Sequence, residues 1–170
     1  MGAARFRQDT LLDLRNDEKA TGQAIGVLFL CALSYGLGLS LANARTFNDF
    51  SLDRILVTIL VTAISSMAAG LVWSITTFLV GTKLFKGSTS YWGLVRPLFF
   101  SVSPALFFVL IAIPVDLASP VVTAIVATWV IIAEVFAIKN AMGFTTQRSM
   151  LTFIVGSLTL ILVQGFFQSI

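Results

Sequence analysis

Five long apolar segments, separated by short polar ones, follow one another along the chain at residues 22–42, 55–81, 94–115, 119–141 and 150–167. Each comes close to the length of about 20 predominantly apolar residues that a helix needs to cross the hydrocarbon core of a bilayer. Lipid offers no partner to an unpaired backbone N–H or C=O, so segments of this kind are helical. The pattern predicts an all-α membrane protein built as a bundle of five transmembrane helices.

The polar stretch ahead of the first apolar segment, residues 1–21, is too short to bury a core of its own. The chain therefore divides into a cytoplasmic N-terminal segment, residues 1–21, and a five-helix membrane domain, residues 22–170. Within residues 6–20 a few apolar side chains, such as Leu11 and Leu14, stand among acids and bases. This pattern is typical of a short amphipathic helix at the membrane interface. A solvated tail is the alternative.

Small residues recur along the second apolar segment at steps of three and four, which places them on one face of a helix. They are Ala63, Ser66, Gly70, Ser74, Thr77 and Gly81. Such a face lets two helix backbones approach closely, and in lipid this contact replaces the hydrophobic effect as the force of association. The pattern predicts a helix-packing face, whose partner is either another span of this chain or a second copy in a homo-oligomer. Packing within the chain is the default, because a five-helix bundle needs such faces.

The third segment contains three prolines, of which Pro97 and Pro114 lie near its ends and Pro104 lies inside. Pro104 removes one backbone hydrogen bond and clashes with a carbonyl of the preceding turn, so we expect a kink there. Ser101 and Ser103 are close enough to bind the freed backbone groups. The kink acts either as a hinge or as a static bend that shapes the bundle.

Glu134, inside the fourth segment, is the only acid at membrane depth. A charged group there costs about 3 kcal/mol on insertion scales, so it needs a partner, a proton or water. Helical spacing places Glu134 on a face of small residues and points it toward protein. Candidate partners are Gln164 in the fifth segment, the serines of the second segment, and a group on another protein. A cation or proton site is one interpretation. A structural hydrogen bond between helices is favoured, because no second intramembrane acid or base completes a relay.

Composition excludes several classes of function. Hydrophobic residues make up 57% of the chain and charged residues 11%, against about 45–50% and about 25% in a soluble domain. The chain has one cysteine, Cys31, and no histidine, so the usual ligands for zinc, haem or copper and the usual proton shuttle are lacking. It contains no nucleophile motif, no phosphate-binding loop and no pair of intramembrane acids. We therefore expect no enzymatic activity, no cofactor and no bound metal.

The basic residues are unevenly divided between the two sides that five spans define. Nine of the eleven lysines and arginines lie in the N-terminal segment and in the loops on its side, and two, Arg45 and Arg54, lie on the other side. By the positive-inside rule the N-terminus is cytoplasmic and the C-terminus is outside. The net charge of +3 thus reflects topology, and no nucleic-acid partner is expected.

A set of loosely spaced residues runs through most of the chain: Leu14 to Gly26, Trp73, Gly81 to Gly87, Leu94 to Pro97, Ser103 and Pro104, Pro114, Trp129, and Lys139 to Arg148. In these positions the chain resembles the Yip (Ypt-interacting protein) domain family of five-span membrane proteins. Eukaryotic members are Golgi and endoplasmic-reticulum proteins that bind Rab-type GTPases, and prokaryotic members have no settled biochemical role. The long N-terminal region of the eukaryotic members has no counterpart here. The resemblance therefore implies a short, prokaryotic-type member in the plasma (inner) membrane.

Together these observations favour a non-catalytic scaffold or accessory subunit, surrounded by membrane lipids, that contacts other integral membrane proteins through its helix faces. The alternative is a small-solute or ion transporter or channel that uses Glu134 and the Pro104-kinked span. Transporters normally show several intramembrane polar sites or paired broken helices, whereas this chain shows one acid and one kinked span. The accessory function is therefore the leading hypothesis.

Overall fold

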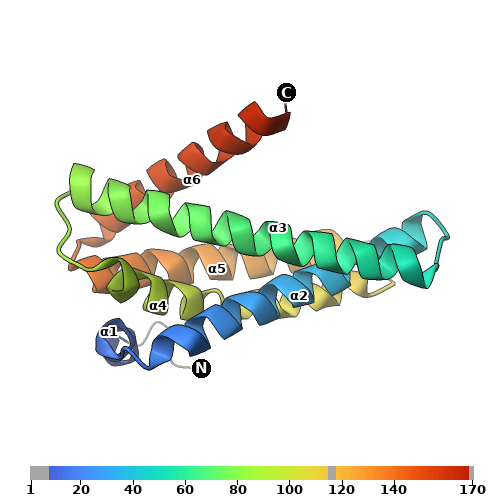
Figure 1. Ribbon diagram of the computed structural model, residues 1–170, viewed down its shortest axis with the longest axis horizontal. Coiled ribbons are helices and arrows are strands. Elements are labelled where there is room, and N and C mark those ends of the chain that lie inside the picture. Colours follow the sequence, from blue (N-terminus) through green and yellow to red (C-terminus); the bar gives the residue numbers. More distant parts are fainter. Residues whose placement is uncertain (1–7, 115–117, 169–170) are drawn as a thin grey trace.

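The protein forms a bundle of helices (Figure 1). The computed structural model describes residues 8–114 and 118–168, and every regular element in these two ranges is helical. In chain order the elements are α1 (Gln8–Asn16), α2 (Ala20–Thr46), α3 (Leu52–Leu79), η2 (Val80–Leu84), α4 (Tyr91–Ser101), η3 (Ser103–Ala112), α5 (Ala118–Met142) and α6 (Thr146–Gln168). The all-α class and the helical bundle predicted from the sequence are confirmed.

Four helices are long and apolar enough to cross a membrane: Ala20–Thr46, Leu52–Leu84, Tyr91–Ala112 and Ser119–Met142. They correspond to the first four predicted spans, the third of which begins and ends three residues earlier than predicted, and the protein is therefore embedded in a membrane. The fifth predicted span, residues 150–167, lies within helix α6. The side chains at 159 and 160 and from 162 onwards lie outside the described part of the chain. A count of five spans stays a prediction.

The two ends of the bundle differ in charge. Helix α1, the η2–α4 connection and the α5–α6 connection lie at one end, and the α2–α3 connection, the end of η3 and the start of α5 lie at the other (Figure 1). The first end carries bases that include Arg15, Lys83 and Arg148, and the second carries Arg45 and Arg54. The fold thus brings to one end the described basic residues that the sequence assigns to one side of the membrane.

The third membrane-crossing segment is broken in its middle. Helix α4 ends at Ser101, and after Val102 the chain continues as the 3-10 helix η3, with Pro104 in its first turn. A proline lacks the N–H that an α-helix needs and disfavours the α conformation of the residue before it. The α-helix therefore ends where the sequence predicted a kink, and a tighter helix takes over.

Helix α4 begins earlier than the sequence indicated. Ser90 stands at its N-cap, and the Ser90 hydroxyl accepts a hydrogen bond of 3.1 Å from the backbone N–H of Gly93. This pairing satisfies one of the N–H groups that a helix start leaves free. Because the helix starts at Tyr91, Pro97 lies inside α4. The prediction that Pro97 lies near the end of the span is therefore wrong.

Ser34 of α2 pairs two backbone groups of the broken span. Its hydroxyl donates to the carbonyl of Leu106 at 2.6 Å and accepts from the N–H of Val109 at 3.2 Å. Leu106 is 72 residues away in sequence. One side chain of α2 thus satisfies a donor and an acceptor in the middle of η3, where lipid offers neither.

Two further α2 residues bind carbonyls at the two ends of η3. The thiol of Cys31 donates to the carbonyl of Val102 at 3.5 Å, and the guanidinium of Arg45 donates to the carbonyl of Ala112 at 2.5 Å. The sequence assigned this task to Ser101 and Ser103. Ser101 does donate to a carbonyl freed by the break, that of Leu98 in the last turn of α4. The groups of η3 are bound by α2 instead, and the sequence missed these partners because they come from a distant segment of the chain.

Helix α2 meets its neighbours at two glycines. A Cβ at Gly38 would collide with the carbonyl oxygen of Phe108 in η3, and a Cβ at Gly36 would lie 2.9 Å from the carbonyl oxygen of Ile59 in α3. Both approaches are closer than real Cβ atoms make, and each is to backbone, which moves less readily than a side-chain tip. These glycines therefore let two other segments lie directly against the α2 backbone, as small residues do between membrane helices.

Helix α1 is folded against the basic end of the bundle. Leu11 is fully buried and lies in one core cluster with Leu94 of α4. Buried Arg96 secures the start of α2: its Nε donates to the Thr21 hydroxyl at 2.7 Å and its Nη1 to the Arg15 carbonyl at 3.1 Å. Residues 1–7 of the predicted N-terminal segment lie outside the described residues, and the interfacial position of α1 stays a prediction.

Helix α6 runs away from the other helices after its first turns (Figure 1). Its buried residues in the part whose side chains are described are Ser149, Thr152 and Gly156, all small or hydroxyl-bearing. Trp73 of α3 donates its ring N–H to the hydroxyl of Ser157 at 3.3 Å. Small side chains near its start thus join α6 to α3 and α5.

We expect Gly38→Ala to lower the free energy of unfolding by about 2 kcal/mol, because the added methyl group must push η3 away from α2. Gly22→Ala, in the same helix, is the matched control, since a Cβ at Gly22 meets nothing within 4 Å. Alanine also favours a helix over glycine by about 1 kcal/mol, so this control should be as stable as the wild type or more so. Thermal unfolding in a mild detergent measures both. Equal melting temperatures would contradict the close approach of α2 and η3.

Candidate functional site

The small-residue face of α3 lies inside the bundle. Its buried members are Ala63, Ser74, Thr77 and Gly81, and its half-buried members are Ser66 and Gly70. A Cβ at Gly70 would lie 3.3 Å from the side chain of Leu28 in α2, and the Ser74 hydroxyl lies 2.9 Å from the hydroxyl of Tyr91 in α4. Along its length the face therefore contacts α2 and then α4 of the same chain.

A cavity of about 320 Å³ lies between α2, α3, η3 and α5. Ser66 and Gly70 of the small-residue face contribute to one wall, and Ala105 and Phe108 of η3 contribute to another. Thr123 of α5 also lines the cavity and is exposed, so the cavity reaches the outer surface of the bundle. In a membrane-embedded protein that surface faces lipid or another protein.

Glu134 brings the only carboxyl group into the lining of this cavity. Among the described residues no side chain or backbone group donates a hydrogen bond to this carboxyl, and none forms an ion pair with it. Lys139, five positions along the same helix, donates to the hydroxyl of Thr146 at 3.0 Å instead. A carboxyl at membrane depth without a partner among the described residues has to take a proton, a water molecule, a ligand or a group outside those residues.

The sequence named Gln164 and the serines of the second span as candidate partners of Glu134. Ser66 lines the same cavity, but it makes no hydrogen bond to the Glu134 carboxyl. The side chain of Gln164 lies outside the described residues, so a hydrogen bond between Gln164 and Glu134 stays a prediction. Of the proposed polar site, the structure therefore brings together Glu134 and Ser66 only.

Cys31 and Tyr35 of α2 also line the cavity, and the sequence analysis did not single them out as site residues. The Tyr35 ring meets the Phe108 ring edge to face, with 5.4 Å between the ring centroids. The thiol of Cys31 donates a hydrogen bond to the carbonyl of Val102, the residue before η3. Together with Ser34, these residues form a short polar run one helical turn long in an otherwise apolar segment. That run is the signal in the sequence that marks this part of α2.

The cavity lining combines apolar walls with a single carboxyl group. Within residues 8–114 and 118–168, no three His, Cys, Asp or Glu side chains gather where they could hold a metal ion. Glu134 has no second acid or base beside it in the cavity lining. Apolar walls with one carboxyl fit a group that has an apolar body and carries a single donor or positive charge.

The glycines of the Gly81 to Gly87 segment, part of the Yip-like pattern, have defined structural tasks. The N–H of Gly87 donates to the carbonyl of Gly81 at 2.8 Å, which closes the turn after the π-helical η2. A Cβ at Gly81 would collide with the side chain of Met142 in α5, and a Cβ at Gly87 would lie 2.7 Å from the Phe144 ring. Glycine at these two positions lets the side chains of Met142 and Phe144 pack directly against the backbone of the η2 segment and the turn that follows it.

Comparisons with protein-family models, with curated proteins and with solved structures gave no match for this chain. Its function therefore has to be inferred from the site itself.

We expect Glu134→Leu to be as stable as the wild type, or more stable by about 1 kcal/mol. The substitution removes an unpaired carboxyl from an apolar cavity, and no described group loses a hydrogen bond. Glu134→Gln, of nearly the same shape, is the matched variant. Thermal unfolding and size-exclusion profiles in mild detergent measure both. A loss above about 2 kcal/mol in the Leu variant but not in the Gln variant would show a hydrogen bond within the chain, with Gln164 as the first candidate.

Proposed function

We propose that the protein is a non-catalytic scaffold or accessory subunit that binds another integral membrane protein at the Glu134 cavity. The observation that carries this proposal is that the only carboxyl at membrane depth faces a cavity open to the bundle surface and has no partner among the described residues. A helix of a second protein that presents a hydroxyl, amide or basic side chain would supply that partner.

The outer surface of the bundle leaves room for such a partner. In the most apolar 18-residue stretch of Leu52–Leu84 only 6% is buried inside the chain, against 56% in that of Tyr91–Ala112. The exposed side chains of α3 include Leu60 and Ile64, one turn apart. Lipid tails cover such side chains as well as a partner helix does, so this surface permits assembly without requiring it. The need for a partner helix comes from the Glu134 carboxyl in the cavity.

We infer a prokaryotic plasma membrane, with the N-terminus in the cytoplasm, as the location. Support comes from the concentration of described basic residues at the end of the bundle that carries α1. The resemblance of the sequence to the Yip domain family supports a short, prokaryotic-type member of that family. Rab binding is not part of the proposal.

A small-solute or ion transporter or channel is the second candidate, and the broken third span favours it. Broken helices at membrane depth form substrate sites in transporters, because their freed backbone groups bind the solute. Here Ser34 already binds the backbone of Leu106 and Val109, which leaves Glu134 as the main polar group for a solute. A site with so few free polar groups supports the accessory function better.

We expect a photoreactive benzoylphenylalanine at position 123, on the rim of the cavity, to cross-link one membrane protein of defined mass in native membranes. The same probe at position 125 should give lipid adducts only. Ile125 is 61% exposed and points almost the opposite way from Thr123, because two helical steps turn through about 200°. Mass analysis of the adducts after extraction in mild detergent reads out both positions.

The Glu134→Leu substitution should abolish the adduct formed at position 123, because the partner loses the carboxyl that it binds. Equal adducts at positions 123 and 125, or an unchanged adduct in the Leu variant, would contradict the proposal. Cation or proton flux into liposomes that disappears in Glu134→Gln, with assembly intact, would favour the transporter instead, since an amide does not titrate.

We expect single cysteines at positions 88, 119 and 169, on a Cys31→Ser background, to label from opposite sides of the membrane. Position 88 lies at the basic end of the bundle and should label from the cytoplasm, whereas positions 119 and 169 should label from outside. Membrane-impermeant maleimide on whole cells and on inverted vesicles makes the measurement. Cytoplasmic labelling at position 169 alone would show that α6 does not cross the membrane. Cytoplasmic labelling at position 119 would show that the orientation of the whole bundle is the reverse of the predicted one.

A further inference from the structure

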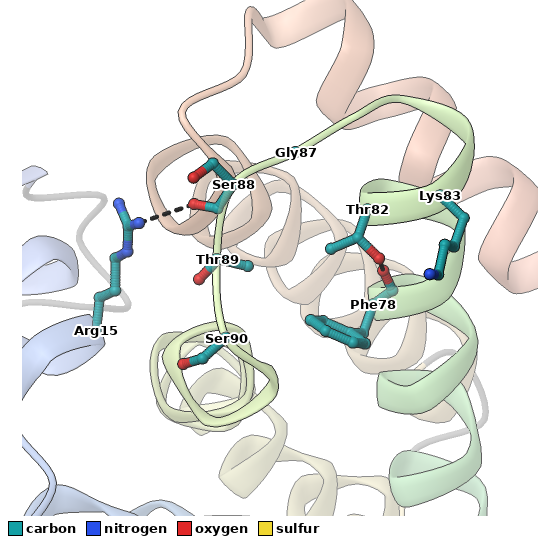
Figure 2. Close-up of a pocket in the computed structure, with 8 residues that line it drawn as sticks. All are labelled: Arg15, Phe78, Thr82, Lys83, Gly87, Ser88, Thr89 and Ser90. Atoms are coloured by element: carbon teal, nitrogen blue, oxygen red, sulfur yellow. Dashed lines mark hydrogen bonds between the residues drawn. The ribbon is translucent and has the colours of Figure 1, made fainter.

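A second cavity, of about 610 Å³, lies at the basic end of the bundle, far along α3 from the Glu134 cavity. Figure 2 shows its three sides: Arg15 at the end of α1, Phe78, Thr82 and Lys83 where α3 passes into η2, and the connection 87–90 between them. Arg15 reaches across to this connection and donates to the carbonyl of Ser88 at 2.8 Å. The cavity thus joins the N-terminal segment, the end of the second span and the connection that follows it, which are separate in the sequence.

The charge of this cavity is positive. Arg15 and Lys83 both line it, and none of its lining residues is acidic. Neither base forms an ion pair with any described residue. The Arg15 guanidinium uses one N–H for Ser88 and has further donors left, and the Lys83 ammonium has three. Two unpaired bases on one cavity form a site for an anion.

Neutral donors surround the same space. The start of α4, an eleven-residue helix, lies at Ser90, and the first turn of a helix carries partial positive charge. The Ser90 hydroxyl accepts from Gly93 and keeps its own proton to donate. The hydroxyls of Ser88 and Thr89 also line the cavity. An oxyanion with several acceptor oxygens, such as a phosphate group, matches this combination of two positive side chains and several hydroxyl donors.

The position along α3 and η2 indicates where such a phosphate comes from. Helix Leu52–Leu84 has 33 residues and is therefore roughly 50 Å long, against a hydrocarbon core of about 30 Å. Its two ends must reach the headgroup layers. Beside the cavity, Leu79 and Leu84 are exposed, and the Phe78 ring lines the cavity itself. Apolar surface directly next to an anion site suits a molecule with a phosphate and acyl chains.

We propose that this cavity binds the phosphate group of an anionic phospholipid in the leaflet on the α1 side, with Arg15 and Lys83 as its charged ligands. Phosphatidylglycerol is favoured over phosphatidylcholine, because two unpaired bases repel the ammonium of a choline headgroup. The bound lipid would bridge α1, the end of α3 and the start of α4. Lipid binding at this end thus holds the N-terminal helix on the membrane.

Lys83→Gln tests the proposal most cleanly, since Lys83 is exposed and makes no hydrogen bond or ion pair with the described residues that its loss could disturb. Arg148→Gln is the matched control: Arg148 is an exposed base at the same end, in the first turns of α6, and does not line the cavity. The full-length protein is reconstituted into vesicles of equal parts phosphatidylglycerol and phosphatidylcholine and extracted in mild detergent. Native mass spectrometry then counts the lipids that each variant retains.

We expect the wild type, Arg148→Gln and Lys83→Arg to retain phosphatidylglycerol in preference to phosphatidylcholine. Lys83→Gln should retain about fivefold less, the effect of one modest charge pair. An equal loss of retained phosphatidylglycerol in Lys83→Gln and Arg148→Gln would overturn the site. It would show that the lipid is attracted to the basic end of the bundle as a whole. Unchanged retention in Lys83→Gln would overturn it as well.

A further arm separates the lipid from free phosphate. Excess inorganic phosphate during extraction should leave the bound phosphatidylglycerol in place. Inorganic phosphate has no acyl chains to contact Phe78 and its neighbours, and it should therefore bind more weakly than the lipid. Displacement of the lipid by inorganic phosphate would overturn the lipid as the natural ligand. Arg15→Gln should lower retention too, with a lower melting temperature, because it also removes the hydrogen bond to Ser88.

Discussion

The hydrogen bonds between α2 and the broken third span are the interaction on which this bundle depends. A backbone donor or acceptor that stays unpaired in hydrocarbon costs several kcal/mol, and η3 forms the second half of a membrane-crossing segment. Runs of 3-10 helix longer than three or four residues are uncommon, and η3 has ten. Ser34, Cys31 and Arg45 bind it in its middle and at both ends. Gly38 allows the approach that brings these groups into reach.

The same arrangement explains why a cavity lies beside η3. A 3-10 helix is narrower than an α-helix, and this one is held close to α2, so it does not fill the space between α2, α3 and α5. Small residues on the facing side of α3, Ser66 and Gly70, leave that space open as well. Glu134 on α5 then faces a gap with no described partner. Four backbone groups in and beside the broken span are bound by α2, whereas the Glu134 carboxyl has no hydrogen-bond partner among the described residues.

The sequence was a good guide wherever a single segment carries the information. Apolar length gave the four described spans, proline chemistry placed the break at Pro104, and helical spacing put the small-residue face of α3 on one side. It misled where a partner lies far away in the chain. Ser101, close to the break in sequence, binds a carbonyl of α4, whereas the backbone in the middle of η3 is bound by Ser34 of the distant α2. The sequence also did not indicate that Cys31 and Tyr35 line the Glu134 cavity. The sequence predicted too late a start for α4, because the Ser90 N-cap follows a polar, glycine-containing stretch that is typical of a loop.

The order of synthesis bears on the hydrogen bonds between α2 and η3. A polypeptide leaves the ribosome from its N-terminus, and helix α2 is complete before the third span emerges. Ser34, Cys31 and Arg45 are therefore already in the membrane when the unpaired carbonyls of η3 arrive there. Were the order of these two segments reversed, the broken helix would have to enter lipid with its backbone unsatisfied. The order of the two spans along the chain thus places the donors of α2 in the membrane ahead of the broken span that they bind.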